Sequence, residues 1–226
     1  DNEQIFMAHF ALSWPDGHQG WQRYSRGGDH DGISRAGVTA SPFAAWMDDW
    51  EIRGRGYSGM PMRVRARQEK FALSLEMNSA QGVVLQGEAG FSQKHPGGGG
   101  SYYYSQPFLE AQGQIVIDGK EIQVHGQAWL DHEWSSEILP EGARGWDWIG
   151  INLHDGGGLM GFQMRDGEGR AIWGAGTLSD ASGASTALGP DDVRFTPVRR
   201  WRSPRTGIEY PVEWAVTVAE RRYRLR

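Results

Sequence analysis

The sequence predicts an all-β fold built from antiparallel hairpins. Three observations favour it: short runs of alternating polar and apolar residues, turn dipeptides between those runs, and no long amphipathic helix pattern. The 226 residues include 33 glycines and 11 tryptophans, which is typical of turn-rich, aromatic β-sheet proteins. Closed antiparallel barrels and sandwiches both produce such a meander of strands.

The first part of the chain reads as hairpins. Residues 5–12 predict a buried strand, residues 14–17 its turn and residues 19–26 the returning strand. Residues 42–53 are aromatic and acidic, and they fit either a strand or a short helix. Residues 62–70 alternate and place three arginines on one face, which is either a solvated strand face or an anion site.

The next segments surround a flexible loop. Residues 71–76 alternate, and residues 83–89 are predicted to pair with them. The glycine-rich run at 96–101 predicts a loop, after which residues 102–107 resume an extended segment. The loop lacks the Gly-Lys-Ser/Thr sequence of phosphate-binding loops, so we reject a nucleotide site there.

Hairpins continue through the second half. Residues 113–134 contain the clearest one, because the Asp118-Gly119 dipeptide favours a tight turn. Further strands are predicted at 148–153, 159–165 and 171–178. Residues 180–190 are rich in Ser, Ala and Gly and predict a linker or a long loop, beyond which strand patterns resume.

Composition argues against several functions. The net charge of −5 argues against a nucleic-acid binder, which would need a basic surface, and the absence of cysteine excludes disulfides and thiol nucleophiles. Because His125, His132 and His154 lack a tight ligand spacing, we predict no metal, and we predict no cofactor. No Gly-x-Ser-x-Gly elbow marks a serine hydrolase, and no apolar run is long enough to span a bilayer.

Both ends of the sequence are abrupt. It begins at Asp1 without a methionine, and it stops inside the strand-like pattern at 214–226. We therefore expect both ends to be truncated, with any targeting signal outside the sequence.

The most informative segment is the aromatic block WLDHEW at 129–134, which is followed by GWDW at 145–148. Tryptophan is costly to expose, and tryptophans around titratable groups are typical of a pocket for an apolar ligand. Alternate residues of a strand share a face. The even-numbered row from residue 122 is apolar, so it predicts that His132 and Trp134 point inward together. Trp129 and Asp131 would then point the other way.

The following strand offers two readings. Trp148 and Asn152 share one face, and isoleucines share the other. If the even face points inward, both residues line one semi-polar pocket with His132 and Trp134; otherwise this strand only adds core. The predicted ligand contacts are Trp134, Trp148, Tyr104, Asn152, Trp129 and His9.

Each polar candidate has two interpretations. His132 is either a proton donor or acceptor in the cavity, or a buried histidine bound to a carboxylate or a carbonyl. Asp131 either orients His132, or acts as an acid with a raised pKa, or is an ordinary ladder-end residue. Asp147 is either an acid kept protonated by its flanking tryptophans or a cap for the loop at Gly145. His9 is either a core histidine or a ligand contact.

These motifs resemble the AttH-like lipocalin-type family, which is related to the carotenoid 1,2-hydratases (hydroxyneurosporene synthases). The resemblance rests on five segments, namely SYYYSQP at 101–107, VHGQAWLDHEW at 124–134, GWDW at 145–148, MAHFAL at 7–12 and YPVEW at 210–214. It covers nearly the whole chain.

The resemblance implies two successive lipocalin-like antiparallel β-barrels. Residues 1–190 would form the first barrel without its initial strands, and residues 191–226 would begin the second. The resemblance also favours an exported, periplasmic or cell-envelope protein of a bacterium. Hydratases of the related branch add water to a terminal isoprenoid double bond. That reaction needs an acid, aromatic faces that stabilise a cation, and a base.

Three functions follow as hypotheses. The first is binding of an apolar small molecule, lipid or isoprenoid-like, in the Trp-lined barrel. The alternative is an acid–base enzyme of hydratase or cyclase type, in which His132, Asp131 and Asp147 are catalytic, although strand parity puts His132 and Asp131 on opposite faces. A further alternative is an accessory component of a bacterial envelope complex. The sequence leaves the oligomeric state open.

Overall fold

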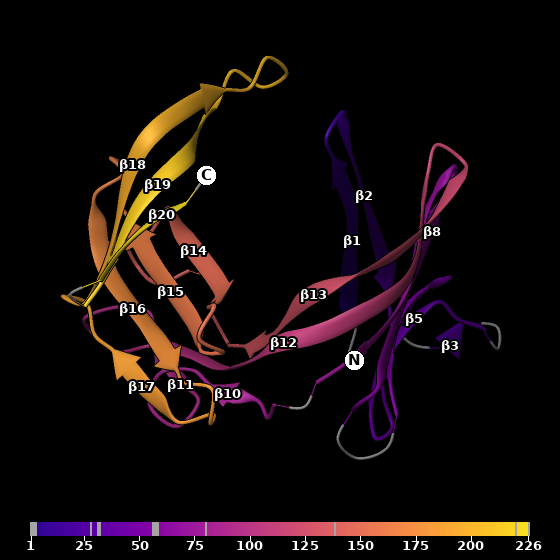
Figure 1. The fold of residues 1–226 in the computed structure, drawn as a ribbon, viewed down its shortest axis with the longest axis horizontal. Coiled ribbons are helices and arrows are strands. Elements are labelled where there is room, and N and C mark those ends of the chain that lie inside the picture. The colour runs from indigo at the N-terminus through magenta and orange to yellow at the C-terminus, as the bar shows by residue number, and fades with distance from the viewer. Residues whose placement is uncertain are drawn as a thin grey trace. The chain divides into compact units, whose positions relative to one another are not determined.

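The regular secondary structure of the described residues consists of β-strands alone (Figure 1). The computed structural model describes residues 4–27, 29–30, 33–55, 59–79, 81–137, 139–219 and 221–225. Every strand pair with a defined register is antiparallel. The predicted all-β antiparallel fold is therefore confirmed. Within these residues no apolar helix of membrane-spanning length occurs.

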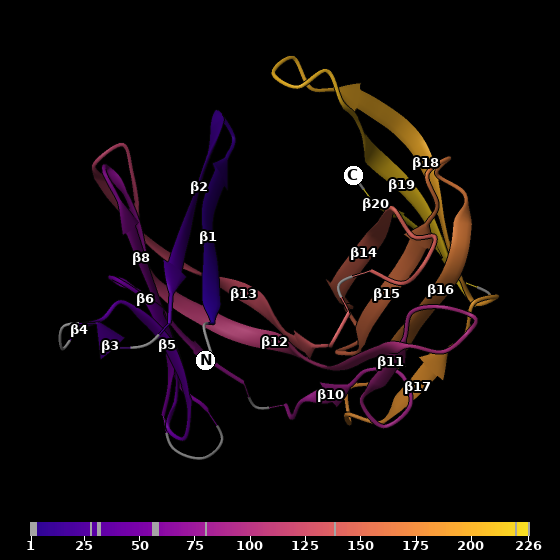
Figure 2. The ribbon, with the colours of Figure 1, turned by 180° about the vertical axis from the view of Figure 1, so that it is seen from behind.

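The chain divides into two compact units. Unit 1 comprises Asp1–Ala80 and Leu109–Ala128, and unit 2 comprises Gln81–Phe108 and Trp129–Arg226. The long strands β12 (Gly100–Ile117) and β13 (Lys120–Trp134) pair with each other, and each contributes residues to both units. They lie side by side in both views of the ribbon (Figures 1 and 2). The division at residue 190 that the family resemblance implies stays a prediction.

Unit 1 is built from hairpins in chain order. Its other strands are β1 (Ile5–Trp14), β2 (Gly17–Arg26), β3 (Asp29–His30), β4 (Ile33–Ser34), β5 (Ala36–Ala40), β6 (Phe43–Met47), β7 (Trp50–Gly54), β8 (Met62–Gln68) and β9 (Phe71–Asn78). Strands β5 to β9 pair consecutively, and β9 pairs with β12. The structure thus resolves residues 42–53 into two strands, joined through Asp48 at φ 52°, and the helix alternative is wrong.

The core of unit 1 is aromatic. Phe10 of β1 is buried, stacks on Trp21 at 5.1 Å and meets Trp50 edge-on at 5.7 Å. The even face of β1 therefore packs inward. His9 lies on the opposite, exposed face beside Met7, so the interpretation of His9 as a core histidine is wrong.

The predicted Asp-Gly turn between β12 and β13 is confirmed. Asp118 has φ 55° and Gly119 has φ 81°, and two successive positive φ angles are the signature of the tight hairpin turn that suits twisted strands. The amide of Gly119 also donates a 2.8 Å hydrogen bond to the carbonyl of Lys70, which fixes this turn beside the one joining β8 to β9.

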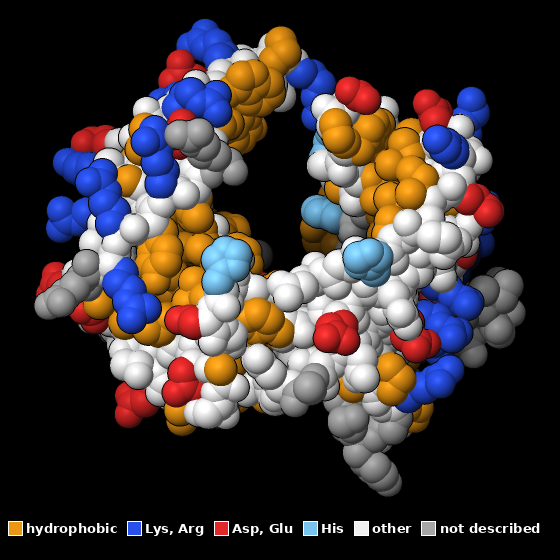
Figure 3. All heavy atoms as spheres, viewed as in Figure 1, with side chains coloured by type: hydrophobic (Ala, Val, Ile, Leu, Met, Phe, Trp, Pro, Cys, Tyr) orange, Lys and Arg blue, Asp and Glu red, His pale blue; other side chains and the backbone are white. Residues whose placement is uncertain are grey.

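Unit 2 contains two further sheets. Its other strands are β10 (Val84–Leu85), β11 (Phe91–Gln93), β14 (Gly145–Asn152), β15 (Gly158–Arg165), β16 (Ala171–Ser179), β17 (Ser185–Leu188), β18 (Val193–Arg202), β19 (Glu209–Val218) and β20 (Arg221–Leu225). The sheet orders are β14-β15-β16-β17 and β18-β19-β20. Figure 3 shows hydrophobic side chains gathered over β14–β16, and Lys and Arg side chains over β18–β20.

Two predictions about segments of unit 2 are wrong. Residues 83–89 do not pair with residues 71–76, because β10 joins β12 while β9 is occupied by β8 and β12. The predicted linker at 180–190 contains strand β17, which pairs with β16 and contributes Leu188 to the buried core. Both errors concern short segments. A short strand pairs with whichever long strand still has an unpaired edge, and the sequence does not show which strand that is.

Sheet-on-sheet packing fills the interior of unit 2. One buried apolar cluster joins both sheets, and its members are Leu159, Leu188, Val193, Phe195, Val216 and Val218. The cluster includes residues on both sides of position 190. Among the described strands no sheet closes on itself, so the predicted closed barrel is not formed by backbone pairing. The apolar faces are covered by packing against another sheet instead.

Candidate functional site

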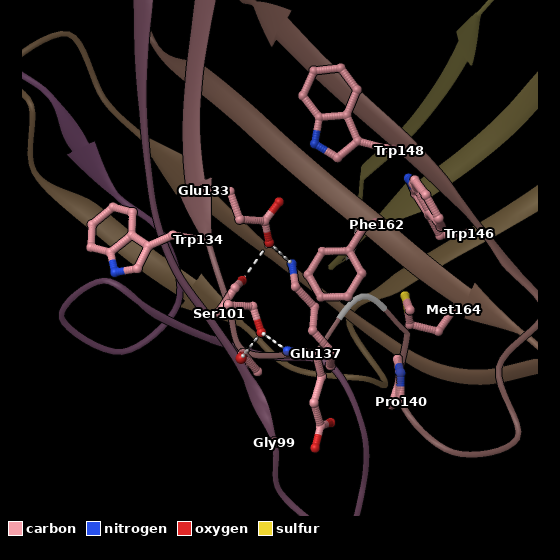
Figure 4. Close-up of a pocket in the computed structure, with 13 residues that line it drawn as sticks. Gly99, Ser101, Glu133, Trp134, Glu137, Pro140, Trp146, Trp148, Phe162 and Met164 are labelled. Carbon is pink, nitrogen blue, oxygen red and sulfur yellow. Dashed lines mark hydrogen bonds and ion pairs between the residues drawn. The ribbon is translucent and has the colours of Figure 1, made fainter. Parts of the chain in front are cut away.

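A cavity of about 370 Å³ lies within unit 2 (Figure 4). That volume falls in the range of small-molecule sites, roughly 300–1,000 Å³. Residues from β12, β13, β14 and β15 and from two loops line it, namely Lys94, Gly99, Gly100, Ser101, Glu133, Trp134, Ser135, Glu137, Pro140, Trp146, Trp148, Phe162 and Met164. The cavity therefore draws on segments that lie far apart in the sequence.

Strand register builds the apolar wall of the cavity. Trp146 stands opposite Met164, and Trp148 stands opposite Phe162, on the antiparallel pair β14–β15. Side chains directly opposite on one face of such a pair pack against each other. Phe162 and Met164 are buried, whereas the two tryptophans are partly open to solvent. Both faces of β14 are used: Trp146 and Trp148 of the even face line the cavity, whereas Ile149 and Ile151 of the odd face pack against the core cluster.

The polar end of the cavity holds the Lys94 amine. Its Nζ lies 2.9 Å from Glu133 Oε1 and donates a 3.1 Å hydrogen bond to Ser92 Oγ. The same nitrogen lies 4.0 Å from the ring centroid of Phe162 and 5.2 Å from that of Tyr103. Burial lowers the pKa of Lys94, while Glu133 and then Asp131 oppose the shift. Ser101 donates a short hydrogen bond to Glu133 and holds that carboxylate against the amine.

The Asp131 carboxylate gathers donors from two strands. Its Oδ1 accepts hydrogen bonds from Tyr103 Oη at 2.7 Å, Ser105 Oγ at 2.6 Å and Trp129 Nε1 at 2.9 Å. Tyr103 is only 3% exposed, and burial together with the Asp131 charge raises the pKa of its phenol. Tyr103 therefore remains a proton donor to Asp131 at neutral pH.

The cavity wall is tied to this network. Trp148 Nε1 donates a 3.1 Å hydrogen bond to Tyr103 Oη, so the phenol links a wall residue to Asp131. On the other side, the buried Gln86 donates from Nε2 to Ser105 Oγ at 2.8 Å. Its Oε1 has no hydrogen-bond partner among the described residues. A hydrogen-bonded chain thus runs from Gln86 through Ser105, Asp131 and Tyr103 to Trp148.

The predicted parity of the aromatic block is reversed. Asp131 and Glu133 bond to the buried Tyr103 and Ser101 of β12, and His132 lies on the opposite face, although all three side chains of β13 are exposed. The reason is the partner strand: Tyr103 is buried against Phe162 and its neighbours, so the odd-numbered face of β12 is the inner one. The apolar even row that suggested the other assignment belongs mainly to the part of β13 in unit 1.

The exposed face carries its own aromatic group. His132 Nδ1 and Tyr104 Oη lie 3.0 Å apart, and Trp134 packs 5.0 Å from the His132 ring. Trp134 also stacks on Tyr102 at 5.8 Å. The structure therefore brings together the predicted His132, Trp134 and Tyr104, but on the outer face. Figure 4 shows the Trp134 ring turned away from Phe162, at the edge of the cavity.

Asp147 lies outside the cavity. Its Oδ2 is 2.8 Å from Arg165 Nε, and its side chain is 8% exposed. Burial raises the pKa of Asp147, and the nearby charges of Arg165 and Arg200 oppose that shift. As an odd-numbered residue of β14 it lies on the face opposite Trp146 and Trp148.

The remaining predicted contacts are dispersed. Asn152 Oδ1 accepts a 3.1 Å hydrogen bond from the Phe108 amide and is not among the lining residues. Trp129 packs edge-on to Trp148 at 6.5 Å, behind the wall. His9 borders a separate cavity of about 320 Å³ within unit 1, together with Trp46 and Trp50.

Sequence reasoning missed Lys94, Ser101, Glu133 and Phe162 as site residues. One signal was present for Lys94, because the sequence holds only three lysines among 23 basic residues. Phe162 and Ser101 carry no such signal, since their roles arise from register. Within the described residues, no cluster of three metal-ligating side chains occurs. The arrangement offers an ammonium–carboxylate pair facing aromatic rings, which suits binding or proton transfer at a small organic molecule.

The comparisons with known proteins agree with this fold. The family model described as AttH-like matches residues 1–226. A crystal structure of an AttH-type protein from Nitrosomonas europaea has a TM-score of 0.88 and 42% identity, covering 97% of this chain and 68% of that one. Kievitone hydratase from Nectria haematococca has a TM-score of 0.64 and 16% identity, covering 96% of this chain and 68% of its own. No curated protein sequence matches the chain.

Proposed function

The chain belongs to the AttH-like family, and we propose that its tryptophan-lined cavity binds a small, largely apolar molecule that carries one polar group. The observation that carries this proposal is the division of the cavity into an apolar wall and a polar end. Trp146, Trp148 and Phe162 form the wall, and Lys94 with Glu133 forms the polar end. Ligand sites typically combine apolar lining with a few placed polar groups.

The rings favour a flat or elongated ligand. Phe162 and Met164 offer buried surface at the base, while the two tryptophans keep partly open faces toward the cavity. Burying apolar surface contributes about 25 cal/mol per Å². A ligand that covers one indole face should therefore gain roughly 1–2 kcal/mol from that contact alone.

The test is a titration with the fluorescent probe N-phenyl-1-naphthylamine. Trp146→Ala should weaken probe binding about tenfold, the equivalent of about 1.4 kcal/mol. Trp201→Ala is the matched control, because Trp201 is a similarly exposed tryptophan of unit 2 that does not line the cavity. Equal binding by the wild type and both variants would contradict the proposal.

A second candidate function is hydration of an alkene by acid–base catalysis. The observation that favours it is the Lys94–Glu133 pair, at 2.9 Å, facing Trp148 and Phe162. An acid near aromatic faces suits protonation of an alkene, because a desolvated ring stabilises a cation by about 2 kcal/mol. The kievitone hydratase fold supports the same candidate.

This candidate has its own experiment. A terminal prenyl alkene such as geraniol is incubated with the protein in H₂¹⁸O, and tertiary alcohol containing ¹⁸O is measured by mass spectrometry. Glu133→Gln should reduce turnover at least 100-fold, the lower end for loss of general acid–base catalysis, which is roughly 10²–10⁴. Glu137→Gln is the control, since Glu137 is an exposed carboxylate at the same cavity. Equal turnover of the two variants contradicts the role of Glu133.

A further inference from the structure

Lysine is scarce in this chain, and one lysine is unlike the others. Only three of the 23 basic residues are lysines. Lys70 and Lys120 are exposed at the ends of tight turns. Lys94 has a side chain that is 17% exposed and borders the cavity. The chain therefore places a primary amine, rather than a guanidinium, in the cavity.

The surroundings of the Lys94 amine combine an apolar wall with one carboxylate. The ring of Phe162 lies at 4.0 Å and that of Tyr103 at 5.2 Å, while Glu133 Oε1 lies at 2.9 Å. Burial disfavours the charged form of this amine, and a carboxylate at 2.9 Å can receive its proton. Desolvated lysines of this kind serve as nucleophiles toward carbonyl groups.

We propose that Lys94 forms an imine with the carbonyl carbon of an apolar aldehyde or ketone bound in the cavity. The proposal deepens the ligand-binding function and rests on it. The lowered pKa of Lys94 supports the proposal, because only the neutral amine attacks a carbonyl. An arginine would serve an ion pair with Glu133 equally well, but it could not form this bond.

The step balances without an oxidant or a reductant. Glu133 takes one proton from the Lys94 ammonium. The nitrogen lone pair then attacks the carbonyl carbon, the C–N bond forms as the C=O π bond breaks, and a proton passes from nitrogen to the carbonyl oxygen to give a carbinolamine. Glu133 returns its proton to the hydroxyl, the C–O bond breaks, and the nitrogen lone pair forms the C=N bond as water leaves. The iminium then gives its remaining N–H proton to the Glu133 carboxylate or to water, which leaves the neutral imine. Amine and carbonyl thus become imine and water.

The ligand class follows from the shape of the cavity. Trp146 and Trp148 stand opposite Met164 and Phe162, so the wall accepts a flat or extended hydrocarbon. The carbonyl of such a molecule has to reach the polar end, where Ser101 and Glu133 are joined by a hydrogen bond. An apolar aldehyde or ketone satisfies both requirements.

The test traps the imine by reduction. The protein is incubated with 2-naphthaldehyde and sodium cyanoborohydride at neutral pH, and a parallel sample receives decanal. Adducts are located by peptide mass spectrometry. Each naphthaldehyde adduct adds C₁₁H₈, because cyanoborohydride supplies the hydride that converts the imine to a secondary amine. We expect Lys94 to be labelled at least tenfold faster than Lys70 and Lys120, and Lys94→Arg to lose that fast adduct alone.

A competition arm places the reaction in the cavity. Excess N-phenyl-1-naphthylamine should slow labelling of Lys94 and leave Lys70 and Lys120 unchanged. Equal labelling of the three lysines by both aldehydes overturns the imine proposal. If the three lysines are labelled equally but the probe binds and Trp146→Ala weakens its binding, the imine proposal is overturned and the ligand-binding function stands. If probe binding is insensitive to Trp146→Ala, the ligand-binding function itself is contradicted.

Discussion

The hydroxyl of Tyr103 donates a 2.7 Å hydrogen bond to Asp131 and accepts a 3.1 Å hydrogen bond from the indole of Trp148. One buried phenol therefore joins a carboxylate of β13 to the wall of the cavity on β14. The relationship explains why the aromatic block at 129–134 and the GWDW segment belong to one site. The hydroxyl can be removed by replacing Tyr103 with phenylalanine, which leaves the ring in place.

Tyr103→Phe should destabilise the fold. Loss of the hydroxyl leaves the Trp148 indole without its acceptor and removes one of three donors from Asp131. A hydrogen bond to a charged group such as Asp131 contributes roughly 1.5–3 kcal/mol to stability, and the exposure of both partners of the hydroxyl places the loss at the lower end of that range. Urea unfolding measures the loss. Tyr102→Phe is the control, because Tyr102 is 55% exposed; an equal effect of the two substitutions would show that the network contributes nothing.

Lys94 should make stability depend on pH in a defined window. The pKa of Lys94 in the folded protein lies below 10.5, the value of an unperturbed lysine. Between the folded pKa and 10.5, the unfolded chain therefore binds more protons than the folded chain. Stability then rises with pH across the window, by at most about 1.4 kcal/mol per pH unit, and is independent of this group below it.

The measurement compares the wild type with Lys94→Met by urea unfolding from pH 7 to 10.5. The difference in unfolding free energy should increase with pH in favour of the wild type. Loss of the ion pair with Glu133 adds an offset, and the slope is the diagnostic quantity. Lys120→Met, at an exposed position, should show no such slope. A flat difference for Lys94→Met would contradict the desolvation of its amine.

His132→Ala should leave the cavity functional. His132 lies on the exposed face with Tyr104 and is not among the lining residues. We expect N-phenyl-1-naphthylamine to bind the variant within about twofold of the wild type, a difference of roughly 0.4 kcal/mol. The same variant should retain any turnover of a prenyl alkene. A tenfold loss of probe binding or of turnover would contradict the placement of His132 outside the site.

Gly113→Ala should destabilise unit 1 strongly. Gly113 has φ 149°, and an added Cβ would collide with the carbonyl oxygen of Ser74 on β9. Backbone strain of this kind costs of the order of 1–3 kcal/mol, before the collision itself. Gly126→Ala on β13 is the matched control, since a Cβ there meets nothing within 4 Å. Thermal unfolding of both variants tests the difference, and equal melting temperatures would contradict it.

Local chemistry predicted much of the fold. The Asp118-Gly119 turn follows from two residues that tolerate positive φ, and the β1–β2 hairpin follows from its alternation and its Pro-Asp turn. The short segment at 83–89 was assigned the wrong partner, because a two-residue strand carries too little pattern to specify pairing. This segment pairs with β12 because β12 has an edge that is not occupied by another strand at that point.

The candidate site was predictable only in part. The tryptophans of GWDW and of the preceding block marked the right region, and Trp134 and Trp148 do line the cavity. The orientation of the block was wrong, because the composition of one strand does not reveal the burial of its partner. Tyr103, packed against Phe162, decides which face of β12 and β13 is inner.

The sequence by itself determined the all-β class, the hairpin turns and the aromatic block, since these depend on residues that are neighbours along the chain. The tertiary structure alone decided that Asp131 faces inward with Tyr103, that His132 faces outward with Tyr104, and that the Lys94 amine meets Glu133 beside Phe162. The physical reason is that side chains alternate with a period of two. One buried contact on a partner strand therefore fixes which face of the neighbouring residues points inward.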